Sequence, residues 1–187
     1  MPSVGELTLI WGPMFASKSS ELISQLERYR CVGLPVLGVN HSMDTRYSTS
    51  HISTHNDNHF PCLRVETLGE LFDRDEYKKC HCIGIDEAQF FSDLRESVIQ
   101  MVEKDQKIVF VAGLTGTYQR TLFGDLYRLV PLADHIITLQ AVCADCADGK
   151  TPGIFTKRLE VQGVYSDQVG GKNVYKPVCR QHYHALT

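Results

Sequence analysis

The stretch IWGPMFASKSSEL, residues 10–22, has nearly the spacing of a phosphate-binding loop. Such a loop consists of a glycine, four residues, and then Gly-Lys-Ser or Gly-Lys-Thr. Its backbone N–H groups, lysine and hydroxyl surround phosphate and Mg²⁺. Here Gly12 opens the pattern and Lys18-Ser19 close it, but Ser17 stands at the second glycine. Taken alone, this degenerate loop fits an ordinary strand–turn–helix as well as a nucleotide site.

Ser17 is the position that decides how well such a loop could work. The second glycine allows the backbone to approach the phosphates closely and to adopt an angle that costs other residues about 1 kcal/mol. Serine is the next smallest polar residue. The sequence therefore predicts a weakened phosphate site rather than the loss of one.

An acidic pair supports the nucleotide hypothesis. In the stretch CIGIDEAQFF, an apolar run ends in Asp86-Glu87. One carboxylate can orient the ligands of Mg²⁺, and the second can accept a proton from a nucleophile. An isolated Asp-Glu pair is more often a solvated turn, but together with the glycine loop it favours a nucleoside triphosphate site.

Two cysteine-containing pairs near the end of the chain have the spacing of a zinc site. Cys143-x-x-Cys146 is followed, after a longer interval, by Cys179-x-x-His182. Four such ligands close a tetrahedral structural site, and a segment poor in apolar residues can gain its fold from the metal. His184 is the rival for the fourth position.

The elements that must position these residues alternate along the chain. We expect strands at residues 6–11, 35–40, 82–86, 107–113 and 135–140. Helical periodicity follows Ser19 and covers residues 68–79 and 92–105, with Ser92 as a candidate N-cap, whereas residues 42–58 are expected to form a loop. This alternation predicts an α/β fold whose parallel sheet has helices on both faces.

Composition sets the limits of the fold. The 187 residues suffice for one domain and a small appendage, and we expect a nucleotide-binding domain at 1–140 and a zinc-binding domain at 141–187. A net charge of −3 and 43% hydrophobic residues indicate a globular protein without the marks of a nucleic-acid or membrane binder. The N-terminal residues lack secretory features, so we expect a cytoplasmic protein. In that compartment its seven cysteines indicate metal binding before disulfides.

Several blocks together resemble a known family. GPMFASKSSEL, DTRYSTS (44–50), GIDEAQFF, LTGTYQR followed by FG (114–124), TKRL (156–159) and the two metal-ligand pairs occur in the order seen in type II thymidine kinases, which include cellular cytosolic and poxvirus enzymes. The resemblance runs nearly from end to end. It implies a RecA-like P-loop NTPase domain, a small zinc domain carrying a lasso loop, and a homotetramer. It also implies transfer of the ATP γ-phosphoryl group to thymidine, and to deoxyuridine, with dTTP as feedback inhibitor.

The resemblance assigns roles at the reacting end of the site. Glu87 would be the general base for the 5′-hydroxyl, and Arg46 would offset charge on the transferring group. Lys18 would hold phosphates, while Ser19 and Asp86 would serve Mg²⁺. The implied nucleotide- and metal-binding set is Gly12, Pro13, Met14, Phe15, Ala16, Ser17, Lys18, Ser19, Asp44, Asp86 and Gln89.

The resemblance also implies a thymidine pocket. Phe90 would stack on the thymine ring. The other residues that would surround or read the base are Met14, Leu114, Phe123, Thr156, Gln168, Val169, Gly170 and Tyr175. Residues 168–170 would read its polar edge through backbone groups, and a base with the wrong edge would leave buried groups without hydrogen bonds.

The chain departs from the family pattern at four places. Ser17 replaces a glycine, and His182 replaces a cysteine found in many members. Tyr118 stands where phenylalanine is frequent, and Asn40-His41 where a lysine is often seen. Zinc accepts either cysteine or histidine. Ser17 places ATP affinity or turnover in doubt, and Tyr118 adds a hydroxyl to the substrate region.

Two other function classes compete with this interpretation. A RecA-type ATPase with a zinc ribbon that acts on nucleic acid would need a basic face or a stacking platform, and the mildly acidic composition argues against it. The second is a non-catalytic assembly module that depends on nucleotide or zinc. In that case Ser17 would mark an inactive catalytic site.

Overall fold

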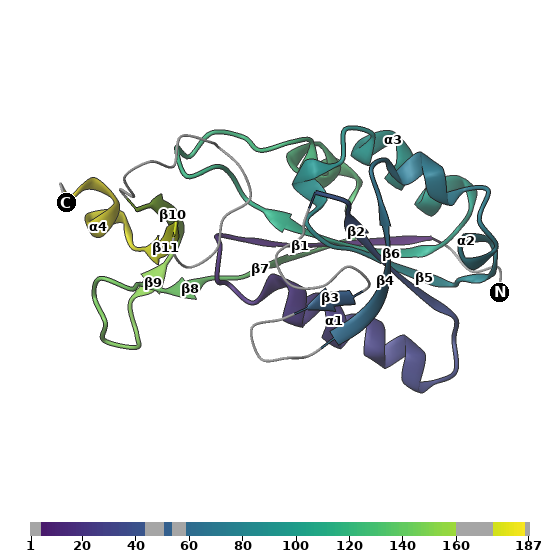
Figure 1. The fold of residues 1–187 in the computed structure, drawn as a ribbon, viewed down its shortest axis with the longest axis horizontal. Helices are drawn as coiled ribbons and strands as arrows, with labels where there is room; N and C mark the ends of the chain where they lie inside the picture. Colours follow the sequence, from purple (N-terminus) through teal and green to yellow (C-terminus); the bar gives the residue numbers. More distant parts are fainter. Residues whose placement is uncertain (1–4, 44–50, 54–58, 160–173, 186–187) are drawn as a thin grey trace.

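A seven-stranded sheet forms the centre of the computed structural model, which describes residues 5–43, 51–53, 59–159 and 174–185 (Figure 1). The strand order is β3-β4-β2-β5-β6-β1-β7. Every pairing is parallel except that of β3 with β4. The strands are β1 (Glu6–Gly12), β2 (Val36–His41), β3 (His51–Ser53), β4 (His59–Val65), β5 (Cys82–Ile85), β6 (Ile108–Leu114) and β7 (His135–Thr138). The predicted α/β class with a mostly parallel sheet is confirmed.

Helical segments cover both faces of this sheet, with α1 on one side and α3 on the other (Figure 1). They are α1 (Lys18–Cys31), η1 (Leu68–Leu71), α2 (Asp75–Lys79), η2 (Ala88–Phe90), α3 (Leu94–Ile99), the π-helical η3 (Gln100–Lys104) and η4 (Leu126–Leu132). Alternate residues of β1 serve the two faces, because side chains of a strand point to opposite sides. Leu9 packs in one core cluster with Leu94 of α3, and Ile10 packs in the other with Leu22 of α1.

The remaining elements gather at one end of the molecule (Figure 1). Strands β8 (Ala141–Val142) and β9 (Pro152–Gly153) pair antiparallel, as do β10 (Phe155–Arg158) and β11 (Tyr175–Val178). The short helix α4 (Arg180–His184) follows. None of the helices in the described part of the chain is long and apolar enough to cross a membrane.

The expected loop at 42–58 was wrong at residues 51–53. These residues form β3, which pairs with β4, a strand that we did not predict. Ile52 of β3 is fully buried in the cluster that contains α1. One buried side chain in a polar stretch has no readable period, so the pairing is determined by the neighbouring strand rather than by local sequence.

The helices expected at 68–79 and 92–105 also differ. The first is divided into η1 and α2, and the second begins at Leu94 with Asp93 rather than Ser92 before it. Asp93 accepts hydrogen bonds from the Leu68 N–H at 3.1 Å, the Gly69 N–H at 2.8 Å and the Ser97 hydroxyl at 3.0 Å. The Asp93 carboxylate thus joins the start of η1 to the first turn of α3, and local capping patterns do not predict such a contact between separate segments.

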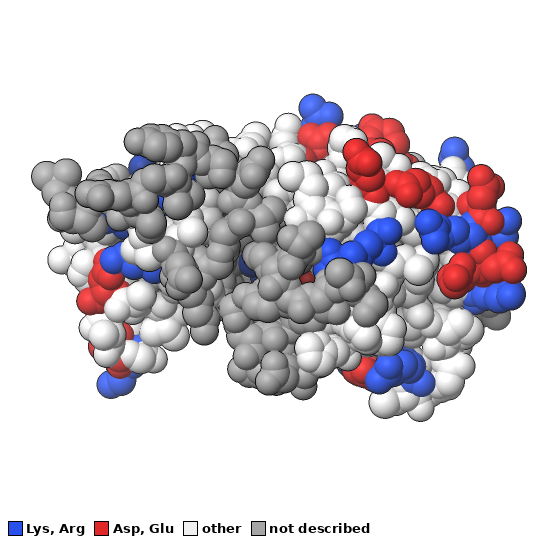
Figure 2. All heavy atoms as spheres, in the orientation of Figure 1, with Lys and Arg blue, Asp and Glu red and all other residues white. Residues whose placement is uncertain are grey.

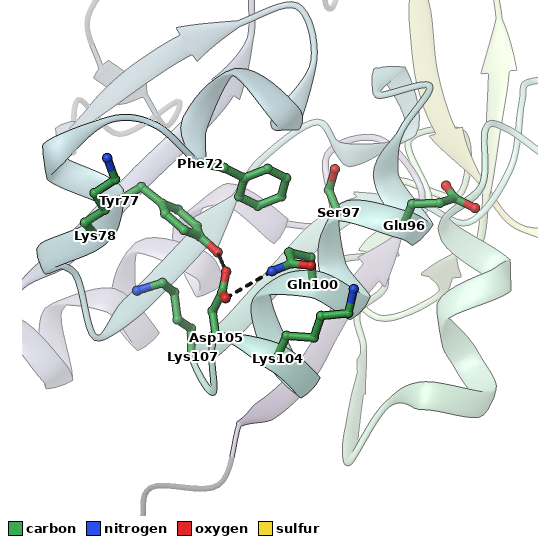
Figure 3. A pocket seen from close by; sticks show the side chains of 9 residues that line it. All are labelled: Phe72, Tyr77, Lys78, Glu96, Ser97, Gln100, Lys104, Asp105 and Lys107. Atoms are coloured by element: carbon green, nitrogen blue, oxygen red, sulfur yellow. Dashed lines mark hydrogen bonds between the residues drawn. The ribbon is translucent and has the colours of Figure 1, made fainter.

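A hollow of about 740 Å³ lies at the edge of the sheet where β6 begins (Figure 3). It is lined by Phe72, Tyr77, Lys78, Glu96, Ser97, Gln100, Lys104, Asp105 and Lys107. Asp105 accepts hydrogen bonds from the Tyr77 hydroxyl at 2.5 Å and from Gln100 Nε2 at 3.1 Å. Burial, and then this bond to Asp105, raise the pKa of Tyr77 well above its ordinary value. Tyr77, Asp105 and Gln100 therefore form a hydrogen-bonded network within the hollow.

Candidate functional site

The loop between β1 and α1 has the architecture of an anion-binding site. At Gly12, any Cβ would lie 2.5 Å from the Leu139 carbonyl oxygen, so only glycine fits. Helix α1 begins at Lys18, and its first intrahelical bond runs from the Glu21 N–H to the Ser17 carbonyl at 3.0 Å. The N–H groups before Glu21 have no helical acceptor and are directed at the loop, where they favour an anion.

Ser17 has a left-handed backbone, with φ 59° and ψ 29°, and its side chain makes no capping hydrogen bond. Phe15 in the same loop has φ 65°. A residue with a Cβ is disfavoured in this region by roughly 1–2 kcal/mol. The loop therefore needs at position 17 the angle that a glycine adopts freely, and the serine carries the strain.

Ser17→Gly is expected to raise the free energy of unfolding by about 0.5–1 kcal/mol, because relief of left-handed strain exceeds the added entropy of a glycine in the unfolded chain. Urea denaturation measures this, and calorimetry with ATP shows whether affinity rises with it. Ser20→Gly, inside α1, is the matched control and should lower stability. A Ser17→Gly protein with unchanged stability, ATP affinity and turnover would show that the serine has no consequence.

Two contacts join the glycine loop to its surroundings. Lys18 Nζ donates to the Pro13 carbonyl at 2.8 Å, so the ammonium lies across its own loop. The Met14 N–H donates to Thr156 Oγ1 of β10 at 3.0 Å. The loop is thereby bonded to a strand that lies far along the chain.

The acidic pair follows β5 directly. Asp86 is only 4% exposed, and its N–H donates to the Val39 carbonyl of β2 at 2.9 Å. Its Oδ1 accepts the Glu87 N–H at 3.0 Å, and Glu87 has a left-handed backbone with φ 50°. Strands β5, β6 and β1 are parallel neighbours, so the carboxylates and the Gly12 loop both lie at the carboxyl ends of the strands. Ligands of open parallel sheets bind at these ends.

Gln89, which the sequence grouped with the nucleotide-binding residues, bonds within the protein. Its Nε2 donates to Glu87 Oε2 at 2.5 Å, and its Oε1 accepts the Leu114 N–H of β6 at 3.1 Å. The predicted general base and the predicted pocket residue are thus connected through one carboxamide.

An aromatic group lies beside the acidic pair. The ring centroids of Phe90 and Phe123 are 5.5 Å apart at an interplanar angle of 88°, an edge-to-face contact. His41, at the end of β2, is 3% exposed. Its ring centroid lies 5.8 Å from that of Phe90 and 4.8 Å from that of Phe91. Sequence reasoning missed His41 as part of this group, although the strand-end argument used for Asp86 applies equally to β2.

A second group surrounds Thr156 and Tyr175, both of which are 7% exposed. The Tyr175 ring lies 6.1 Å from Tyr118, and the Arg158 guanidinium lies 5.5 Å from the Tyr118 ring centroid. Sequence reasoning placed the Tyr118 hydroxyl in the substrate region but gave Arg158 no role. Their signal was present, because both fall in blocks that carry the family resemblance.

Five candidates cannot be placed. Asp44, Arg46, Gln168, Val169 and Gly170 lie outside the described residues. Their expected contacts with phosphate and with the base remain predictions.

The four predicted metal ligands come together. The ligand atoms of Cys143, Cys146, Cys179 and His182 all lie within 4.8 Å of one another. His182 Nδ1 is 3.6, 3.4 and 3.4 Å from the three sulfurs in that order, and Cys146 Sγ is 3.9 Å from Cys179 Sγ. Tetrahedral zinc with its usual bond lengths separates S and N by about 3.5 Å and two sulfurs by about 3.8 Å. The cluster therefore fits zinc.

The chemistry of the donors also fits a cation. Burial raises the pKa of the Cys143 thiol, but hydrogen bonds from the Cys179 and Cys146 backbone outweigh it and lower the pKa to about 6. The pKa of Cys146 is instead raised to about 11, by burial and by the neighbouring Cys143 and Cys179 sulfurs, so Cys143 is the thiol that the protein itself favours as a thiolate. Thiolate is the form that binds metal. His184 lies outside the cluster, with its Nε2 3.3 Å from Arg120.

Helix α4 connects the Cys₃His cluster to the segment after β6 and to β10. The Tyr183 hydroxyl donates to the Tyr118 carbonyl at 2.8 Å, and the Arg120 guanidinium lies 4.2 Å from the Tyr183 ring centroid. Lys157 Nζ of β10 donates to the His182 carbonyl at 3.0 Å and to the Ala185 carbonyl at 2.8 Å. Strand β10 therefore makes two contacts: Lys157 bonds to the metal-ligand residue His182, and Thr156 bonds to the glycine loop.

Comparison with known proteins gives a consistent result. The family model described as thymidine kinase matches residues 5–183. The chain is 40% identical over 182 residues to thymidine kinase a of Arabidopsis thaliana, covering 96% of this chain and 75% of that protein. It is 37% identical over 179 residues to the thymidine kinase of Monkeypox virus, covering 96% and 97% of the two chains. The cytosolic thymidine kinase of Gallus gallus is also 37% identical over 179 residues, which are 96% of this chain and 77% of that protein.

Proposed function

Because the chain belongs to the thymidine kinase family, we propose that it transfers the ATP γ-phosphoryl group to the 5′-hydroxyl of thymidine, and of deoxyuridine, in pyrimidine deoxynucleotide salvage. The observation that carries this proposal is the family match over residues 5–183, which spans the glycine loop, the acidic pair and the metal ligands. The product with thymidine is dTMP.

Phosphoryl transfer depends on position and charge more than on covalent chemistry by the protein. The N-terminus of α1 and Lys18 bind the phosphates, and Lys18 Nζ exchanges its Pro13 acceptor for a phosphate oxygen. The Ser19 hydroxyl and the Asp86 carboxylate would hold Mg²⁺, which neutralises phosphate charge when bound. Arg46 balances charge on the transferring group, and Asp44 supports the metal or the phosphates.

Glu87 acts as the general base. Its carboxylate takes the proton of the 5′-hydroxyl as that oxygen attacks the γ-phosphorus and ADP leaves. The position of Glu87 at the carboxyl end of β5, at the same sheet edge as the glycine loop, supports this role.

The nucleoside lies between the aromatic groups. Phe90 stacks on thymine and is held by its edge contact with Phe123. Met14, Leu114, Thr156 and Tyr175 surround the 5-methyl group, and the bond between Met14 and Thr156 supports their grouping. Backbone groups of residues 168–170 read the polar edge of the base.

The finer organisation follows the family. Residues 1–140 form a RecA-like P-loop domain, and residues 141–187 form a lasso domain held by structural zinc at the Cys₃His cluster. We propose a cytoplasmic homotetramer inhibited by dTTP.

The test is ADP release from ATP-Mg²⁺ by purified protein with thymidine, with deoxycytidine, and without nucleoside. Release only with thymidine is expected. Release without nucleoside, increased by single-stranded DNA, would instead indicate the nucleic-acid ATPase. On the face in Figure 2, the described Lys and Arg side chains are interspersed with Asp and Glu, which favours the kinase. No ADP release and no ATP binding would favour the assembly module.

A further inference from the structure

We infer that Gln89 is a positioning residue, whose carboxamide aims the Glu87 carboxylate and joins it to the β6 backbone at Leu114. The inference rests on the proposed function. It assigns Gln89 to the orientation of the base, a task distinct from contact with nucleotide.

The direction of the carboxamide follows from the groups at its two ends. Leu114 N–H is a donor, so the atom that it meets at 3.1 Å must be the oxygen Oε1. The nitrogen Nε2 then faces Glu87 Oε2 at 2.5 Å and donates to it. A hydrogen bond to a charged acceptor is stronger than one between neutral groups, so the contact restrains the carboxylate.

The surroundings leave Gln89 little freedom to turn. Its side chain belongs to a residue that is only 3% exposed, in the short turn η2. A Cβ at Gly124, which has φ +60°, would lie 2.2 Å from the Gln89 carbonyl oxygen, so the loop after β6 closes directly on this backbone. The Gln89 side chain is therefore bonded to the β6 backbone, and the Gln89 main chain packs against the loop that follows β6.

Glu87 needs such a restraint. Its backbone is left-handed, at φ 50° and ψ 40°, a region that residues with a Cβ rarely occupy. Its side chain adds three rotatable bonds, and misplacement of a reacting group by about 1 Å can cost 100-fold in rate. The bond from Gln89 narrows the orientations that this carboxylate can adopt.

Gln89→Met removes both hydrogen bonds at similar volume, and we expect kcat to fall about 10–100-fold while KM for thymidine and ATP stays within about twofold. Gln89→Glu retains the acceptor for the Leu114 N–H but replaces the amide donor with a second carboxyl group beside Glu87. Two carboxyl groups this close share a proton, which makes Glu87 less available as a base, so kcat should fall at least as far. It also covers the case in which the methionine variant does not fold.

Gln100→Met is the matched control. It likewise removes an amide-to-carboxylate bond, from Gln100 Nε2 to Asp105 at 3.1 Å, in the hollow at the other edge of the sheet (Figure 3). It should shift thermal stability without a change in kcat. A parallel loss of kcat in this control would reduce the Gln89 effect to general destabilisation.

A double-mutant cycle separates positioning from structure. If Gln89 acts only through Glu87, adding Gln89→Met to Glu87→Gln should change kcat by less than about twofold. Multiplicative losses would overturn the inference, as would a Gln89→Met protein with wild-type kcat or with a raised KM alone. Wild-type protein without thymidine-dependent turnover would refute the proposed function itself, before any variant is compared.

Discussion

Glu87→Gln should lower kcat for thymidine phosphorylation by about 10²–10⁴-fold, the usual contribution of a general base. Glutamine has nearly the shape of glutamate but cannot accept the proton of the 5′-hydroxyl at neutral pH. Binding of ATP and thymidine should remain within a few-fold of wild type, because the phosphate loop and the aromatic groups are unchanged. Steady-state kinetics and calorimetry measure the two quantities separately.

Glu96→Gln provides the control for this variant. Glu96 lies on α3 and lines the hollow at the other edge of the sheet, with an exposed side chain. It should retain wild-type kcat. If Glu87→Gln also retains turnover, Glu87 is not the base, and a different group must take the proton.

Removal of the metal is expected to have the second large effect. Structural zinc contributes about 10–16 kcal/mol of binding free energy to small zinc folds, far more than the short strands β8 to β11 could supply. Chelation, or Cys179→Ser, should therefore unfold the segment around α4. The main sheet has its own two core clusters and should keep most of its circular dichroism.

Unfolding of the segment around α4 should also affect the proposed nucleoside site, because hydrogen bonds connect the two. Without α4, the bond from Tyr183 to the Tyr118 carbonyl and the Lys157 contacts disappear, and the bond from the Met14 N–H to Thr156 Oγ1 is weakened. We expect kcat/KM for thymidine to fall at least about 100-fold, with a smaller change in ATP affinity.

Elemental analysis should find one zinc per chain in wild type and none in Cys179→Ser. Cys31→Ser is the control, because Cys31 is exposed and lies outside the cluster. A metal-free protein with full thymidine kinase activity would contradict both the structural role of zinc and its connection to the nucleoside side.

Local patterns in the sequence were enough for the parts of the site that are built from one segment. The glycine loop follows an apolar strand and precedes an amphipathic helix, and the structure has β1, Gly12 and α1 in that order. The x-x spacing of the cysteine pairs predicted four ligands that do converge. Such signals are readable because hydrogen-bond spacing, side-chain period and ligand-pair geometry involve residues close in sequence.

Other features depend on residues that are far apart in the chain. The strand order β3-β4-β2-β5-β6-β1-β7 brings Asp86 and the Gly12 loop together at the carboxyl ends of central strands. No local period in the sequence encodes that order. The bond from Leu114 to Gln89, and the choice of His182 over His184 near the cysteines, likewise follow from packing. The sequence by itself predicted which residues could carry the chemistry, and of these the four metal ligands are seen to converge. Only the tertiary structure decided which of them meet, because that depends on contacts between separate elements buried together.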